Sequence, residues 1–143
     1  MNYQHTQPGH LILWTLLFVV LFFVGLLVYT EIYESVFIML FVILLLTSFA
    51  SLTVTIDAKD LRIQFGYGIY KKCFDLRDIA SSRIVRNKWY FGWGIRVWFW
   101  PYMWIFNVSG FNAIEIKLKN GKIYRIGTDE PKELEQAIQR SIK

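Results

Sequence analysis

The sequence predicts an α+β protein in which a two-helix transmembrane hairpin precedes one water-exposed β domain and a C-terminal helix. Three observations predict this class. Two long uncharged apolar segments stand near the N-terminus, alternating apolar and polar residues follow them, and an amphipathic segment ends the chain. All 16 Lys and Arg residues come after Ala58, which separates an apolar membrane part from a basic aqueous part.

Residues 1–10 are expected to be a short tail, and residues 11–54 the membrane hairpin. Segment 11–30 has 15 Leu, Ile, Val or Phe residues, and as a helix it measures about 30 Å, the thickness of the hydrocarbon core. Segment 35–54 is also uncharged. The link 31–34 is short enough to require an antiparallel hairpin. A cleaved signal peptide fits less well, because it has a basic start and a shorter apolar core.

The charges beside these segments predict their orientation. The link contains Glu31 and Glu34 but no Lys or Arg, whereas Lys59 and Arg62 follow the second segment closely. Positive residues favour the cytoplasmic side, so the N-terminus and the C-terminal domain are expected in the cytoplasm. Neither segment carries an ionisable side chain. That composition disfavours a transporter or proton channel, which use such groups inside the membrane.

Residues 53–143 are expected to form a single domain of about seven short antiparallel strands and a helix at 130–142. Asn120-Gly121 predicts a hairpin with a type I′ turn. Pro131 suits a first helical turn, and Leu134 and Ile138 mark its apolar face. The strands are indicated by period-two patterns at residues 52–56, 61–65, 69–74, 79–86, 95–99, 105–108, 113–118 and 122–126.

Three segments resemble a known family. They are Tyr90-Phe91-Gly92-Trp93-Gly94-Ile95-Arg96, Asn107-Val108-Ser109-Gly110-Phe111 and Ile126-Gly127-Thr128-Asp129-Glu130-Pro131. Together they resemble small bacterial membrane proteins that carry a pleckstrin-homology-like (PH-like) domain behind one or two spans, a mostly uncharacterised family. The resemblance implies a strongly bent antiparallel β-barrel of about seven strands, capped by the C-terminal helix. It also implies a multi-pass protein of the bacterial inner (plasma) membrane.

The segment 89–106 is the first candidate for function, with ten aromatic residues that include five of the six tryptophans. Trp and Tyr favour the membrane interface. This segment is therefore a membrane-facing loop, a core element, or a partner-binding surface, and the sequence leaves the three alternatives open. The candidate contact residues are Trp93, Arg96, Trp98, Trp100, Tyr102 and Trp104.

A basic group next to this segment is the second candidate. Arg83, Arg86 and Lys88 could contact anionic headgroups, each contributing about 1 kcal/mol near such a surface. A solvated strand face is the alternative interpretation. A tethered basic domain is weak evidence for nucleic acid, which is an unlikely partner.

Catalytic and cofactor sites are not predicted. His5 and His10 lie in the expected tail without a metal-ligand cluster, and Cys73 is expected to be a buried structural thiol. The predicted function is a non-enzymatic, membrane-anchored interaction module without a cofactor, which presents the aromatic and basic surface to lipid headgroups or a neighbouring membrane protein. The alternative is a structural subunit of a homo-oligomer or larger membrane complex.

Overall fold

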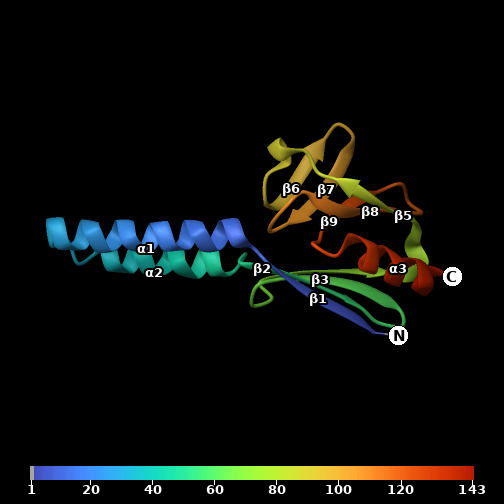
Figure 1. Ribbon diagram of the computed structural model, residues 1–143, viewed down its shortest axis with the longest axis horizontal. Coiled ribbons are helices and arrows are strands. Elements are labelled where there is room, and N and C mark those ends of the chain that lie inside the picture. The colour runs from blue at the N-terminus through green and yellow to red at the C-terminus, as the bar shows by residue number, and fades with distance from the viewer. Residues whose placement is uncertain (1) are drawn as a thin grey trace.

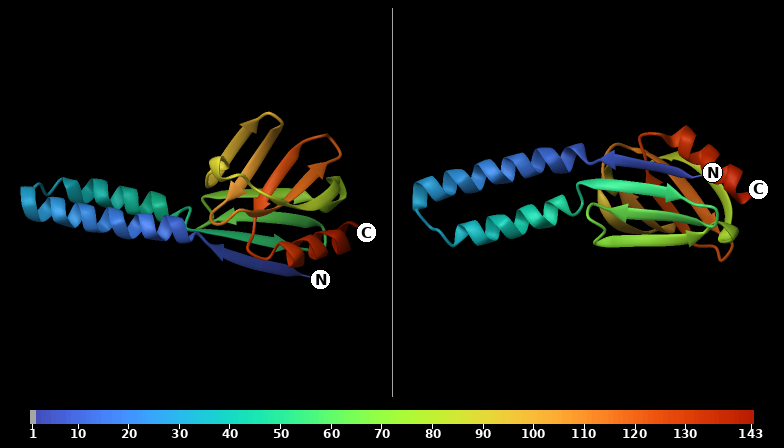
Figure 2. Two further views of the ribbon diagram at one scale, coloured as in Figure 1. Left: turned by 45° about the horizontal axis from the view of Figure 1, so that its top comes forward. Right: turned by 90° about the horizontal axis from the view of Figure 1, so that it is seen from below.

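The computed structural model describes residues 2–143 as a helical hairpin attached to a β domain (Figure 1). The hairpin consists of α1 (His10–Thr30) and α2 (Ser35–Thr47). Both helices lie side by side and project from one end of the β domain (Figures 1 and 2). Helix α3 (Pro131–Ile142) lies toward the opposite end.

The first strand precedes the hairpin. β1 (Tyr3–Pro8) pairs antiparallel with β2 (Ser51–Ile56), which follows the hairpin. The expected tail of residues 1–10 is therefore largely a strand. The polar sequence of this strand did not indicate burial, yet Gln7 is buried and its side-chain nitrogen donates to the Ser109 carbonyl at 3.0 Å.

The second segment that was predicted to span the membrane forms a shorter helix than expected. α2 ends at Thr47, and its 13 residues measure about 20 Å. Leu52 and Val54 belong to β2, where they alternate with threonines and are buried in the core. Among residues 2–143, α1 is the one helix long and apolar enough to cross a membrane.

The described residues contain nine strands in two sheets. Sheet A has the order β1-β2-β3-β4, and sheet B has the order β5-β8-β9-β7-β6. The remaining strands are β3 (Asp60–Phe65), β4 (Tyr70–Asp75), β5 (Ile79–Arg86), β6 (Gly94–Phe99), β7 (Tyr102–Asn107), β8 (Asn112–Leu118) and β9 (Ile123–Gly127). Short 3₁₀ turns, η1 (Leu76–Asp78) and η2 (Trp89–Phe91), precede β5 and β6.

This arrangement confirms the α+β class and corrects three details. The two sheets do not close into a barrel within residues 2–143, and they contain nine strands instead of about seven. β7 also pairs parallel with β9, so the domain is not wholly antiparallel. The two sheets are not joined by a hydrogen-bonded ladder in this part of the chain, and β4 is an unpaired edge of sheet A.

The core fills the space between the sheets. Its buried side chains include Phe65, Phe106, Ile114 and Ile126. Helix α3 packs on β5 and β8. Its residues Leu134 and Ile138 are fully buried, which confirms the predicted apolar face and, within one residue, the predicted helix 130–142.

The β8–β9 hairpin is confirmed, but its turn differs from the predicted type I′. Gly121 has a positive φ of 86° and Asn120 does not. The Asn120 side-chain oxygen instead accepts a hydrogen bond from the Lys122 amide at 3.0 Å. A side chain that binds its own backbone stabilises this longer turn without a second left-handed residue.

Candidate functional site

The aromatic segment 89–106 is divided by the fold into three environments. η2 folds over the outer face of sheet B, β6 and β7 form a hairpin, and the turn between these strands projects from the domain (Figures 1 and 2). A strand directs successive side chains to opposite faces. The predicted contact residues therefore do not form one surface.

The outer face of the hairpin packs beneath η2. Phe91 is buried against Met103 and Ile105, and Trp98 covers this small cluster. The rings of Phe91 and Trp98 are 4.8 Å apart between centroids. For Trp98, the core interpretation therefore accounts for most of its ring surface.

The inner face of β7 carries Tyr102 and Trp104. Trp104 stacks on Phe106, with 6.4 Å between ring centroids and 20° between ring planes. Tyr102, Trp104 and Phe106 line a cleft between the two sheets. Its other lining residues are Tyr70, Lys72, Lys122 and Tyr124. We call this the inter-sheet cleft.

The turn of the hairpin is its most exposed part. Phe99 is 79% and Trp100 90% exposed. We call these two residues the β6–β7 tip. The Trp98 indole donates to the Trp100 carbonyl at 2.9 Å, which holds the turn against its own strand. Figures 1 and 2 show that the tip points away from α1 and α2.

Trp93 and Arg96 lie at the start of β6. Arg96 Nε donates to the Trp93 carbonyl at 3.3 Å. The Trp93 ring packs against Phe111, with 6.3 Å between centroids. Phe111 belongs to the β7–β8 loop, so this contact links the start of β6 to that loop.

Two loops surround the point where the helices leave the β domain. Gly9, just before α1, donates to the Ala50 carbonyl at 2.7 Å and lies against Val108 of the β7–β8 loop. Gly66, in the β3–β4 turn, lies so close to Ser48 that a Cβ there would clash with the Ser48 carbonyl oxygen. Both loops are therefore fixed beside the roots of the helices.

Exposed aromatic, apolar and basic side chains gather at this end of the domain. Tyr67 and Ile69 extend from the β3–β4 turn, and Trp89 is 77% exposed on η2. Figures 1 and 2 place η2 at the end of the domain nearer the helices. We define the collar as Tyr67, Ile69, Arg86, Lys88, Trp89 and Phe111.

The basic residues of the collar lie next to aromatic rings. The Arg86 guanidinium is 5.9 Å from the Phe111 ring centroid, and Lys88 Nζ is 5.5 Å from the ring centroid of Tyr90. The Asn87 amide donates to the Phe111 carbonyl at 2.6 Å, which ties the β5–η2 segment to the β7–β8 loop. Two of the three predicted headgroup contacts are thus in the collar.

Arg83, the third predicted contact, is engaged elsewhere. Its Nε donates to the Glu115 carboxylate at 2.8 Å, and Arg125 donates to the other oxygen of the same carboxylate, also at 2.8 Å. These three residues form a row across the outer face of sheet B. A paired arginine attracts a headgroup less than a free one, because its charge is already compensated.

The other collar residues and most residues of the inter-sheet cleft were not predicted from the sequence. Tyr67, Ile69 and Phe111 occupy turns whose neighbours only the fold reveals. Lys72 carried a usable signal, since Tyr70, Lys72 and Phe74 share one face of a strand. A lysine between two aromatic residues at spacing two departs from the apolar pattern of a core-facing strand.

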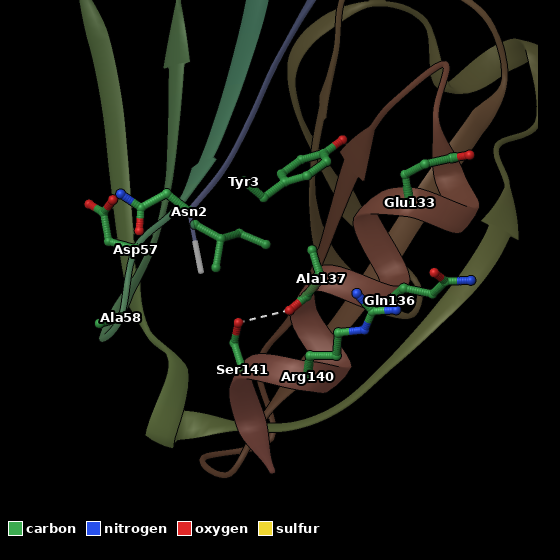
Figure 3. Close-up of a pocket in the computed structure, with 10 residues that line it drawn as sticks. Asn2, Tyr3, Asp57, Ala58, Glu133, Gln136, Ala137, Arg140 and Ser141 are labelled. Carbon is green, nitrogen blue, oxygen red and sulfur yellow. Dashed lines mark hydrogen bonds between the residues drawn. The ribbon is translucent and has the colours of Figure 1, made fainter.

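A cavity of about 500 Å³ lies at the far end of the domain (Figure 3). Asp57 and Ala58 lie on its sheet side, while Gln136 and Arg140 face it from α3. Ser141 donates to the Ala137 carbonyl at 2.8 Å, so its hydroxyl serves the helix. None of the predicted contact residues lines this cavity.

Tyr3 forms part of the same cavity wall. Burial raises the pKa of its phenol far above the usual value, and the carboxylates of Glu130 and Glu133 raise it further. The phenol therefore stays protonated at physiological pH and is no base.

The histidine and cysteine side chains that could act as ligands or nucleophiles do not form a site in the described residues. His5 Nε2 lies 2.6 Å from the Asp129 carboxylate, so it ties β1 to the loop before α3. Cys73 is exposed on β4, which corrects its predicted burial. Within residues 2–143 the structure places no group of three or more His, Cys, Asp or Glu residues that could hold a metal.

Comparison with protein-family models, with curated proteins and with solved structures finds no match for this chain.

Proposed function

We propose that this protein is a non-enzymatic, membrane-anchored interaction module whose hairpin inserts into the bilayer and whose collar rests on anionic lipid headgroups. One observation carries the proposal. The collar gathers exposed aromatic residues and two cations around the point where two apolar helices leave the β domain. Trp and Tyr partition to that depth of a membrane, and Lys and Arg are attracted to anionic lipid.

The hairpin supports anchoring by its length and exposure. α1 has 21 residues, which gives about 31 Å at 1.5 Å per residue, and none of its residues is buried. Exposed Leu, Phe and Val side chains along a whole helix are costly in water. Lipid is the solvent in which this surface is stable.

β1 supports a retained anchor over a cleaved signal sequence. Cleavage after α1 would remove β1, which forms six residue pairs with β2. It would also remove the contact of His5 with Asp129. A sheet edge with unpaired backbone groups would remain, which is a site for aggregation.

The pairing of β1 with β2 also bears on topology, because the chain must leave and return on the same side of the bilayer. We propose that α2 and the link 31–34 return beside α1, with the shorter α2 accommodated by local thinning of the bilayer. The basic β domain then lies in the cytoplasm of a bacterial cell, at the inner membrane. The PH-like resemblance remains part of this proposal, supported by the order of strands followed by a terminal helix.

The collar contributes to orientation more than to anchoring. Arg86 and Lys88 would each contribute about 1 kcal/mol near an anionic surface, an effect that salt screens. The exposed ring of Trp89 adds apolar area at the same depth. Together these contributions would hold the β domain in one orientation against the membrane.

The experiment compares two exposed tryptophans, Trp89 in the collar and Trp100 at the tip. Each is changed to Cys in a Cys73→Ser background, and the full chain is spin-labelled in nanodiscs that contain phosphatidylglycerol. Oxygen and a nickel chelate then report the depth of each label. We expect the label at position 89 at headgroup depth and the label at position 100 in water.

Salt and charge provide the controls. The paired change Arg86→Gln with Lys88→Gln should move the label at position 89 toward water, and so should replacing phosphatidylglycerol by phosphatidylcholine. Arg83→Gln, at the compensated arginine, is the matched control and should change the depth least. A label at position 89 that stays in water under all conditions would refute the lipid-facing role.

The β6–β7 tip favours a second candidate, a structural subunit in a homo-oligomer. Phe99 and Trp100 are both highly exposed, and they lie at the turn between β6 and β7 that projects from the β domain. Exposed aromatic pairs of this kind are typical anchors of protein interfaces. Immobilisation of the label at position 100, together with dipolar broadening between copies, would support that candidate.

A further inference from the structure

The inter-sheet cleft lies where the two sheets meet without hydrogen bonds. β4 is an edge of sheet A and pairs with β3 alone within the described residues. The cleft residues come from β4, from β7, from Lys122 in the turn before β9 and from Tyr124 of β9. Because the sheets do not close into a barrel in this part of the chain, a space of about 230 Å³ remains between them.

Lys72 occupies a core-facing position on this edge strand. Its register partner is Ile63, and the neighbouring pairs are Tyr70 with Phe65 and Phe74 with Leu61. All three β3 partners are buried. Lys72 is thus a cation on the inner face of sheet A, where the pattern otherwise places apolar side chains.

The surroundings of Lys72 are aromatic and lack a compensating anion. Its Nζ lies 5.9 Å from the Tyr124 ring centroid and 6.0 Å from that of Phe74. The residues that line the cleft include no Asp or Glu, and they include a second cation, Lys122. Neither lysine forms an ion pair with any residue from 2 to 143.

The walls offer flat faces beside these two charges. Phe106 stacks on Tyr124 with 8° between ring planes, and Trp104 stacks on Phe106. Burial raises the pKa of the Tyr124 phenol, and the nearby phenols of Tyr70 and Tyr102 contribute. The Tyr124 hydroxyl therefore remains a hydrogen-bond donor at neutral pH.

We infer that the inter-sheet cleft binds a small soluble organic anion, in which a phosphate or carboxylate is joined to a planar ring. Lys72 and Lys122 attract the anionic group, the Tyr124 hydroxyl can donate to it, and the aromatic walls pack against the ring. This site is separate from the collar and does not depend on the proposed contact with the membrane.

Phenyl phosphate is the probe, titrated into the full chain in nanodiscs of phosphatidylcholine. Lysines are labelled by reductive ¹³C-methylation, which keeps their charge, and their NMR signals are followed. We expect saturable shifts of the Lys72 and Lys122 signals. Inorganic phosphate should bind roughly fivefold or more weakly, because it has no ring to pack against the aromatic walls.

Lys71 provides a matched control, since it is the next residue on β4 and its exposed side chain points to the opposite face. Lys72→Met should weaken phenyl phosphate binding by about tenfold or more, as expected for a lost charged hydrogen bond. Lys71→Met should leave it nearly unchanged. Lys72→Arg keeps the charge and should retain most of the affinity, read from the Lys122 signal.

Three results would overturn the inference. Equal weakening by Lys71→Met and Lys72→Met would indicate general charge attraction. Unchanged binding in folded Lys72→Met would show that Lys72 does not bind the anion. Its role would then be that of an inward-pointing charge that protects the edge strand β4 from pairing with other chains. A shift of the Lys72 signal caused by phosphatidylglycerol nanodiscs alone would assign the cleft to a lipid headgroup in place of a soluble anion.

Discussion

The helical hairpin and the β domain use the same apolar residue types in opposite ways. In α1 no residue is buried, and Leu, Val and Phe face outward all round. In β2 and β3 every second residue is buried and the residues between them are polar or charged. The hairpin exposes its apolar side chains, whereas the β domain buries them in a core.

The comparison shows that only a few residues separate the segment with exposed apolar residues from the segment that buries them. This boundary lies at Ser48–Ala50, between the end of α2 and the first residue of β2. Hydropathy does not reveal it, because Leu52 and Val54 are as apolar as residues of α2. The alternation with Thr53 and Thr55 does, since it gives the segment one buried face and one wet face.

The largest expected effect comes from charging the hairpin. Leu17 and Leu21 are exposed near the middle of α1. Changing both to Arg should cost about 6–8 kcal/mol of insertion free energy, comparable to the whole favourable contribution of the segment. We expect the variant to leave the membrane fraction on alkaline washing. Leu17→Ala with Leu21→Ala is the control, and retention of the Arg variant would contradict a lipid-exposed helix.

A core truncation should affect only the β domain. Phe65 is fully buried against Phe49, Tyr70 and Phe106. Phe65→Ala should lower the free energy of unfolding by about 3–5 kcal/mol, measured by urea titration in mild detergent. The exposed Phe41 of α2 is the matched site, and Phe41→Ala should leave this value almost unchanged. Similar losses in both variants would mean that hairpin and domain unfold as one unit.

The junction of the two regions can be tested through two glycines. Gly66 and Gly121 both have positive φ, but only Gly66 lies against backbone, that of Ser48. An alanine in this conformation costs about 1–2 kcal/mol by itself. We expect about that loss for Gly121→Ala, and a loss of about 2–4 kcal/mol for Gly66→Ala, where Cβ also displaces the end of α2. Equal losses of unfolding free energy in urea titrations would show that the end of α2 moves aside at no cost.

The smallest effect concerns pH. Hydrogen bonds from the Arg77 side chain and amide lower the pKa of Asp75 to about 2. Because the folded pKa is depressed, this contact stabilises the domain above the ordinary carboxyl pKa and is lost as pH falls toward 2. Asp75→Asn should therefore reduce the stability difference between pH 5 and pH 2 slightly. A profile identical to that of the parent chain would exclude a contribution from this exposed pair.

Local patterns predicted most of the fold. Period-two alternation predicted β2 to β6, β8 and β9 and the later part of β7, and the amphipathic pattern predicted α3. β1 was missed because its sequence is polar, and the partners of Gln7 and His5, Ser109 and Asp129, lie far along the chain. The open seam between sheets was missed for a similar reason, since closure depends on which edges meet.

The candidate sites were harder to predict, because each joins residues distant in sequence. Arg86, Lys88 and Phe111 meet only once β5 and the β7–β8 loop are side by side. The aromatic density of residues 89–106 indicated a functional segment, but strand alternation distributes Trp98, Trp100 and Trp104 over three environments. The segment could therefore be identified from the sequence, but the direction in which each of its side chains points could not.

The pairing of β1 with β2 makes the connection between the helical hairpin and the β domain stiff. Each helix continues almost directly into one of two strands that are hydrogen-bonded along six residue pairs. A domain held by one flexible linker can swivel, whereas this one has two adjoining supports and no long linker in which to twist. A change in hairpin tilt, such as one caused by bilayer thickness, would therefore turn sheet A with it and reach the far end of the domain as a rotation.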